Sequence, residues 1–212
     1  PGWRQGSVID RACTWLHEVG QRFSVHRSDS EIRRLESGSL ELREAHPDVR
    51  SVLSECERLR ARTDGCFDHR PRAQSRRLDP SALVSIDRVV QDFTRAGVER
   101  FCISAGGDVV CAGGCWRVGI RHPGRVGAVA AVLQVHAGAV ATSGAYERGN
   151  HIWATVRSPD VLSSTVVAPT LGLADALATA VWASGKRSPE WFGRFDNCDL
   201  LTMHADQTMR WT

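Results

Sequence analysis

The sequence has almost no lysine and no long apolar run. Lys186 is the only lysine, so arginine supplies nearly all of the positive charge, and 27 basic against 24 acidic side chains leave a net charge of only +3. No basic cluster is interleaved with aromatic residues, which makes nucleic acid a poor candidate for a ligand. The longest apolar stretches, such as residues 128–133, are far shorter than the ~20 residues that a membrane-spanning helix needs. We therefore expect neither a nucleic-acid partner nor a direct membrane span.

The sequence also lacks a disulfide framework. Its seven cysteines are odd in number and scattered along the chain, which is typical of a reducing compartment. Residues 1–7 are polar and contain no signal-peptide core, so we expect a cytoplasmic location; an extracytoplasmic location, after removal of a leader, is the alternative. Cys111 and Cys115 could be drawn as a metal site with His122, but no second Cys/His pair follows at zinc spacing. Thiols of a hydrophobic core are the better interpretation.

The length of 212 residues fits one domain, or two small halves that share a core. The N-terminal half, about residues 1–99, predicts helices. Ser28 and Glu31 have capping-box spacing for a short helix, and further helices are expected over about 47–63 and 86–96. An earlier amphipathic helix is predicted by apolar residues at three-to-four spacing: Ile9, Cys13, Leu16, Val19 and Phe23.

The C-terminal half, about residues 100–212, predicts strands. Short apolar or alternating segments separated by glycines predict strands over 101–105, 109–111, 116–120, 129–136, 139–142 and 165–168. A helix over about 173–183 follows, and residues 198–204 and 208–211 predict a closing hairpin. Helices first and antiparallel strands later predict a single α+β domain over 1–212, with a mixed or antiparallel sheet flanked by helices in two layers.

One acidic residue stands inside an otherwise apolar helical segment. Asp175 lies within residues 173–182 and Thr179 follows four residues later, so both side chains project from one helix face. A carboxylate and a hydroxyl are hard oxygen donors that Mg²⁺ accepts, with a substrate phosphate completing the octahedron. An ordinary pair on a helix surface is the alternative. A lone buried carboxylate is costly unless it is paired or metal-bound, which favours the functional interpretation.

A glycine-rich turn lies between two apolar strands. Gly106 and Gly107 let the backbone turn sharply and approach a ligand, and Asp108 can hydrogen-bond within such a turn. A plain hairpin turn is the simpler interpretation. Asp79 is a further carboxylate, which could be either a ligand or the N-terminal cap of the next helix.

A polar stretch follows another apolar strand. Thr142, Ser143 and Gly144 end the strand, and His151 comes shortly after. Hydroxyls and exposed amides at a strand end could hold phosphate or ribose oxygens. A surface loop with a hydrogen-bonded histidine is the alternative.

The order of these segments is more specific than any one of them. The chain contains, in succession, Phe23-Ser-Val-His26, Asp29-Ser-Glu-Ile32, Thr63-Asp-Gly-Cys-Phe-Asp68, Leu78-Asp79, Gly106-Gly-Asp108, Trp116-Arg-Val-Gly-Ile-Arg-His-Pro123, Ala141-Thr-Ser-Gly144, His151-Ile and Ala174-Asp-Ala-Leu-Ala-Thr179. This succession resembles the ApbE family, the FAD:protein FMN transferases, in a short form without the family's first strand. The resemblance covers about residues 9–185, and its most diagnostic segment is 174–179.

The resemblance implies an α+β fold with an active cleft between two halves that binds FAD. It implies transfer of the FMN moiety of FAD to a Thr or Ser hydroxyl of an acceptor flavoprotein, with Mg²⁺ on the pyrophosphate and release of AMP. By the same resemblance Asp175 and Thr179 are catalytic, and they hold Mg²⁺ together with the backbone oxygens of Ala82 and Ala178. The residues assigned to FAD are His26, Cys66, Phe67, Asp68, Asp79, Gly106, Gly107, Asp108, Thr142, Ser143, Gly144 and His151.

Two departures from the family pattern bear on activity. After Val84 the family continues with Lys-Gly-aromatic, whereas here Ser85 follows directly; after Trp153 the family carries Asp-Pro, whereas here Ala154 follows. Both fall in loops expected to face the cleft, as true deletions or as residues absent from this sequence. True deletions would leave FAD binding and remove transfer. The alternatives to the transferase are therefore a FAD-binding protein without transfer activity and a FAD pyrophosphatase that uses water as the acceptor.

Overall fold

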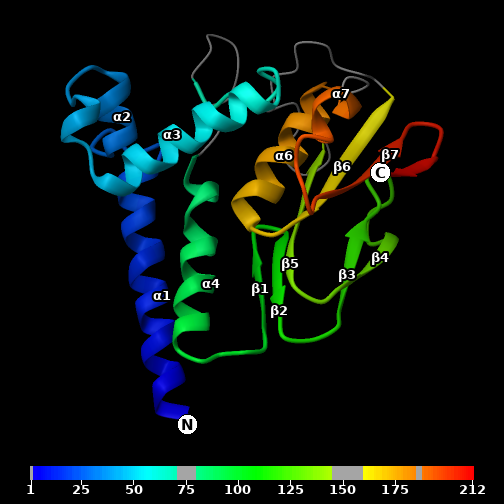
Figure 1. Cartoon of the computed structure of the whole chain (residues 1–212), viewed down its shortest axis with the longest axis horizontal. Coiled ribbons are helices and arrows are strands. Elements are labelled where there is room, and N and C mark those ends of the chain that lie inside the picture. Colours follow the sequence, from blue (N-terminus) through cyan, green and yellow to red (C-terminus); the bar gives the residue numbers. More distant parts are fainter. Residues whose placement is uncertain (1, 71–79, 145–159, 185–187) are drawn as a thin grey trace.

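A computed structural model of the chain describes residues 2–70, 80–144, 160–184 and 188–212. The first half is helical and the second half is mostly sheet, as the sequence predicts (Figure 1). The helices and 3-10 turns of the first half are α1 (Gly2–Phe23), α2 (Glu31–Glu36), η1 (Leu42–Glu44), α3 (Pro47–Arg62), η2 (Pro80–Leu83) and α4 (Ser85–Arg95).

The second half contains one large sheet, one hairpin and two helices. Its elements are β1 (Phe101–Ala105), β2 (Asp108–Ala112), β3 (Trp116–Arg121), β4 (Val129–Val135), β5 (Gly138–Gly144), β6 (Val161–Ala168), α6 (Leu171–Ser184), α7 (Ser188–Phe192), β7 (Asp199–His204) and β8 (Met209–Trp211). The large sheet has the order β1-β2-β5-β6-β7-β8, and its neighbouring strands are antiparallel. The predicted α+β class is therefore confirmed, with an antiparallel sheet. The short helix α7 was not predicted.

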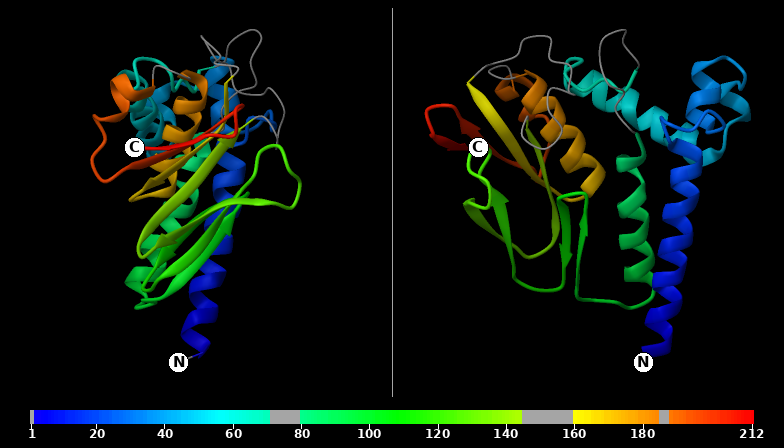
Figure 2. Two further views of the ribbon diagram at one scale, coloured as in Figure 1. Left: turned by 90° about the vertical axis from the view of Figure 1, so that its right-hand side faces the viewer. Right: turned by 180° about the vertical axis from the view of Figure 1, so that it is seen from behind.

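Helix α6 covers one face of the sheet and the β3–β4 hairpin covers the other. The orange α6 runs along β5 and β6 in each view (Figures 1 and 2). Ala139 and Ala141 of β5 belong to the core on the α6 side, whereas Val140 packs with Val118 and Ile120 of the hairpin. Because successive side chains of a strand point to opposite faces, β5 is buried on both sides.

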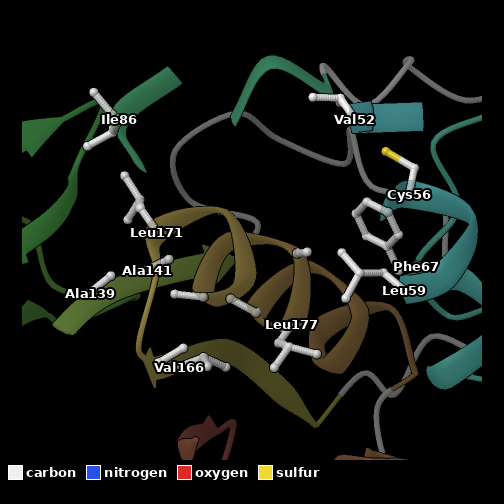
Figure 3. Close-up of a cluster of buried hydrophobic side chains, with 14 of the residues drawn as sticks. Val52, Cys56, Leu59, Phe67, Ile86, Ala139, Ala141, Val166, Leu171 and Leu177 are labelled. Atoms are coloured by element: carbon white, nitrogen blue, oxygen red, sulfur yellow. The ribbon is translucent and has the colours of Figure 1, made fainter. Parts of the chain in front are cut away.

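The largest hydrophobic cluster joins the two halves around α6. Leu171 and Leu177 of α6 contribute to it together with Leu59 of α3 and Phe67 (Figure 3). Within the described part of the chain, no helix combines the length and the apolar character that a membrane span requires.

Helix α1 buries only part of the predicted face: of its five predicted core residues, Val19 and Phe23 are buried. Ile9 and Leu16, placed by the sequence in the core, are 53% and 39% exposed, and Cys13 is also exposed. The buried face of α1 is Val8, Ala12, Trp15, Val19 and Phe23. Trp15 decides the rotation, since its Nε1–H donates to the Ser85 carbonyl of α4 at 3.0 Å while the ring is buried.

The cap of α2 also differs from the prediction. Ser30, not Ser28, is the N-cap, and its Oγ accepts the Arg33 N–H at 3.2 Å. Glu31 is therefore the first helical residue and does not complete a capping box. Its carboxylate instead accepts the backbone N–H of His46 at 2.6 Å.

Candidate functional site

The helix that carries Asp175 and Thr179 is anchored at its start by a carboxylate from α4. Asp87 accepts hydrogen bonds from the backbone N–H groups of Leu171, at 2.8 Å, and Gly172, at 3.1 Å. A helix start leaves these N–H groups without intrahelical partners. Burial raises the pKa of the Asp87 carboxyl, and the hydrogen bonds from α6 partly oppose that rise. Asp87 thus fixes where α6 begins.

A glycine in the first turn of α6 lets η2 touch the helix. A Cβ on Gly172 would lie 2.7 Å from the Leu83 Cα and 2.9 Å from the Leu83 oxygen, so this approach requires glycine. Ala82, whose backbone oxygen the resemblance assigns to the metal, precedes Leu83 in η2. The backbone of one predicted ligand segment therefore packs against the helix that carries the other ligands.

Two hydroxyl contacts hold the middle of α6 to the sheet. Thr179 is 5% exposed, and its Oγ1 lies 3.2 Å from the Ser143 Oγ at the end of β5. The Ser164 hydroxyl of β6 donates to the Ala178 carbonyl at 2.7 Å. Thr179, a predicted metal residue, is therefore adjacent to Ser143, a predicted FAD residue. The Asp175 side chain is half-buried one turn earlier on the same helix.

The chemistry of these donors fits Mg²⁺. The Asp175 carboxylate and the Thr179 hydroxyl are hard oxygen donors, and Mg²⁺ is commonly bound through one or two carboxylates together with substrate phosphates. The Ala178 carbonyl, also assigned to the metal, already accepts the Ser164 hydroxyl, and it lies inside α6, where a carbonyl also accepts the N–H four residues on. Among the residues that the structure describes, no group of three His, Cys, Asp or Glu side chains is placed to hold a metal. The fit therefore rests on one carboxylate and neutral oxygens.

The glycine-rich turn meets the end of β5 on the opposite face of the sheet. Gly106 and Gly107 have positive φ values of 62° and 104° in the β1–β2 turn, as the hairpin interpretation requires. The carboxylate of Asp108 reaches beyond its own turn, because Oδ1 accepts the Thr142 N–H at 3.1 Å. Two segments assigned to FAD thus touch each other.

A cavity of about 150 Å³ opens beside this contact, between the sheet and the β3–β4 hairpin. Asp108, Thr142 and Arg121 are among the residues that line it. The cavity lies within the strand-rich half and not between the helical and strand-rich halves.

Strand β5 therefore divides the predicted site residues into two groups. Ser143 faces α6 and contacts Thr179, whereas the Thr142 hydroxyl contacts that of Thr165 at 2.9 Å on the cavity side. Gly144 ends the strand, and it is buried. The two groups are separated by one layer of backbone.

The segment after α3 is held by contacts of its own. The Phe67 N–H donates to the Thr63 hydroxyl at 3.0 Å, and its ring is 5% exposed in the core (Figure 3). The carboxylate of Asp68 receives two hydrogen bonds of 2.9 Å from the Arg70 guanidinium. Cys66, which directly precedes Phe67, is partly buried. The assigned contacts of these residues with FAD stay predictions.

Of the three remaining assignments to FAD, one lies within the described residues. His26 is exposed in the loop between α1 and α2, where its N–H donates to the Ser24 hydroxyl at 3.2 Å. Asp79 and His151 lie outside the described residues, as does the departure after Trp153.

At Val84, where the sequence lacks the Lys-Gly-aromatic segment of the family pattern, η2 and α4 are joined without an intervening loop. Val84 closes η2 by donating its N–H to the Ser81 carbonyl at 3.1 Å, and its own carbonyl accepts the Arg88 N–H at 3.2 Å. Val84 is at once the end of η2 and the N-cap of α4. The short sequence thus passes directly from the 3-10 turn into the helix.

Sequence reasoning missed Asp87 and Ser164. The two N–H groups that donate to Asp87 lie 84 and 85 residues away in the sequence, and the carbonyl that accepts the Ser164 hydroxyl lies 14 residues away. No local spacing in the sequence reveals these partners. The one available signal was an acidic residue next to Ile86 on the buried side of an amphipathic helix.

The cysteine interpretation needs correction as well. Cys111 is a core thiol, as expected, but Cys115 is exposed. The neighbour of Cys111 is Cys102, with the two sulfur atoms 3.5 Å apart.

No curated protein matches the sequence. Solved structures of ApbE proteins from several organisms are similar to this chain. The flavin transferase ApbE of Vibrio cholerae has a TM-score of 0.74 at 19% identity, covering 98% of this chain and 88% of that one. The ApbE protein of Thermotoga maritima has a TM-score of 0.78 at 19% identity, with coverages of 96% and 88%. The flavinyl transferase ApbE of Pseudomonas stutzeri, in its apo form, has a TM-score of 0.77 at 16% identity, with coverages of 98% and 87%. At such identities these likenesses establish the fold.

The sequence itself carries the family match. Residues 3–75 and 72–201 match the ApbE family. These ranges include the glycine-rich turn, the end of β5 and the whole of α6. The chain belongs to the ApbE family.

Proposed function

We propose that this protein transfers the FMN moiety of FAD to a Thr or Ser hydroxyl of an acceptor flavoprotein, with Mg²⁺ as the metal and AMP as the second product. Membership of the ApbE family supports flavin transfer, and two of the similar structures are named flavin or flavinyl transferases. The observation that carries the proposal is the 3.2 Å contact between Ser143 and Thr179. It joins a strand end suited to phosphate oxygens to a helix face with metal-ligand chemistry.

Asp175 and Thr179 would hold the metal, with the backbone oxygen of Ala82 contributing from η2. When bound, Mg²⁺ supplies charge neutralisation at the pyrophosphate of the substrate.

The neighbouring residues of this chain hold those donors in place. A Thr hydroxyl has one proton and two lone pairs. If the Thr179 proton is directed to Ser143 Oγ, a Thr179 lone pair is free to face a ligand. The Ser164 hydroxyl holds the same turn of α6 to the sheet by donating to the Ala178 carbonyl, and Asp87 fixes the start of the helix. The arrangement positions oxygen donors before substrate arrives, which is how a buried site avoids reorganisation during the reaction.

The test is a transfer assay with FAD, Mg²⁺ and the apo form of a flavoprotein whose FMN is normally attached to a threonine through a phosphoester. The expected result is release of AMP together with a fluorescent acceptor whose mass rises by one FMN moiety. AMP with free FMN and an unlabelled acceptor would instead identify a pyrophosphatase. Tight FAD binding without AMP would identify a FAD-binding protein.

A matched pair of variants tests the metal assignment. Asp175→Asn should abolish Mg²⁺-dependent AMP release while the fold is retained, because the amide cannot supply the anionic donor. Asp199→Asn changes an exposed carboxylate of the same half and should leave the rate unchanged. Equal rates for the two variants would reject Asp175 as a metal ligand.

A further inference from the structure

Two cysteines face each other across the first two strands of the sheet. Cys102 of β1 is the register partner of Cys111 of β2, and the Cys111 thiol donates to the Cys102 sulfur across 3.5 Å. Register partners of an antiparallel pair have Cα atoms about 4.5–5.5 Å apart, which lies within the range that disulfides span. The two sulfur atoms can therefore be joined without a change of strand register.

The two thiols differ in their access to solvent. Cys111 is 1% exposed, because the β3–β4 hairpin packs over it. Cys102 lies on the edge strand, is not part of that packed cluster, and is exposed. Burial, and after it the neighbouring Cys102, raises the pKa of the Cys111 thiol above its usual range. An oxidant arriving from solvent meets Cys102 first.

We infer that Cys102 and Cys111 form a modification site at which a peroxide converts the dithiol into a reversible disulfide. Cys102, as thiolate, attacks one oxygen of hydrogen peroxide, the O–O bond breaks, and Cys102 sulfenic acid and hydroxide are formed. The Cys111 sulfur then attacks the sulfenic sulfur. The S–S bond forms as the S–O bond breaks, and the Cys111 proton leaves with the departing hydroxide as water.

The reaction balances without any group beyond the two thiols and the oxidant. Two thiols and one hydrogen peroxide give one disulfide and two waters, and two electrons pass from sulfur to oxygen. Directly opposed residues usually have Cβ atoms about 4.5–5.5 Å apart, more than the ~3.8 Å typical of disulfides. A bridge at this position is therefore readily opened by a small dithiol reductant.

The sequence makes the test direct. Arg100 and Arg117 bound one tryptic peptide, residues 101–117, which contains Cys102, Cys111 and Cys115. The reduced protein is treated with a small molar excess of hydrogen peroxide, alkylated with iodoacetamide, digested and analysed by tandem mass spectrometry. We expect a peptide with one alkyl group, on Cys115, and two hydrogens fewer than the dithiol. Dithiothreitol should restore three alkylation sites.

Single variants assign the bridge. Cys115→Ser should still lose two hydrogens, whereas Cys102→Ser should not, and Cys111→Ser should accumulate Cys102 sulfenic acid that dimedone traps. Cys102→Ser changes an exposed residue, so its result stands even where the buried replacement disturbs folding. A bridge to Cys115, full alkylation of all three cysteines after peroxide, or sulfinic acid on Cys102 of the wild type without a bridge would each overturn the inference.

Discussion

Replacing Asp87 by alanine removes the acceptors for the first N–H groups of α6. The two hydrogen bonds measure 2.8 and 3.1 Å, and their donors belong to the buried residues Leu171 and Gly172. A buried donor left without an acceptor costs about 1–3 kcal/mol, and losing a helix cap costs about 0.5–2 kcal/mol. We expect Asp87→Ala to lower the free energy of unfolding by about 2–4 kcal/mol. The corresponding fall in Tm is about 4–16 °C for a chain of this size.

Urea and thermal unfolding followed by circular dichroism measure this loss, and two variants calibrate it. Asp87→Asn keeps one carbonyl acceptor and should lose about half as much. Asp92→Asn removes a carboxylate of the same helix that pairs only with Arg95 and Arg88 among the described residues, at 3.3 and 3.6 Å. A surface pair of this kind is worth about 0–1 kcal/mol. If Asp87→Ala lost no more than Asp92→Asn, Asp87 would not be the anchor of α6.

Three further changes test separate parts of the structure. Burial lowers the pKa of His69 in the folded protein. The stability that the neutral imidazole gives is therefore present above the usual His pKa of about 6.5, and it is lost as the pH falls from there through the lower folded pKa. The urea midpoint of unfolding should fall more steeply with acid in the wild type than in His69→Asn. Gly172→Ala forces a Cβ against the η2 backbone and should lower the free energy of unfolding by about 1–3 kcal/mol. Gly20→Ala, on an open helix surface, should instead raise it by about 0.5–1 kcal/mol. Thermal unfolding of the two variants measures both changes. Ser143→Ala removes the hydrogen-bond partner of Thr179 and should weaken the apparent Mg²⁺ affinity about 10-fold or more. Saturating Mg²⁺ should restore AMP release. An unchanged Mg²⁺ titration would contradict the positioning role of Ser143.

Local patterns were sufficient for most of the elements. The strand over 101–105 was predicted with its observed bounds, because alternation and the glycine turn that ends it are both encoded within a few residues. The buried face of α1 was not predicted correctly, since two stripes overlap on that helix and share Val19 and Phe23. Which stripe is buried depends on Trp15 reaching the backbone of α4, 70 residues away.

The candidate site was predicted as a set of segments and not as a geometry. Residues 142–144 and 174–179 were each recognisable from their own sequence. The contact between Ser143 and Thr179 bridges 36 residues, and it depends on the pairing of β5 with β6 and on the rotation of α6 above them. Strand alternation places Thr142 and Ser143 on opposite faces of the sheet. This alone did not predict what each side chain contacts, because the sequence does not show that α6 covers one face and the β3–β4 hairpin the other.

The centre of the sheet shows why the strands carry hydroxyls where apolar side chains would pack more easily. Ser143 is paired in register with Ser164, and Thr142 with Thr165, and a buried hydroxyl without a hydrogen bond costs about 1–3 kcal/mol. Each of these hydroxyls has a partner: those of the two threonines contact each other, and those of the two serines contact Thr179 and the Ala178 carbonyl. On the α6 face both contacts fall on the same turn of the helix. The register of β5 and β6 therefore sets the height and rotation of α6, and with them the direction in which the Asp175 face of the helix points.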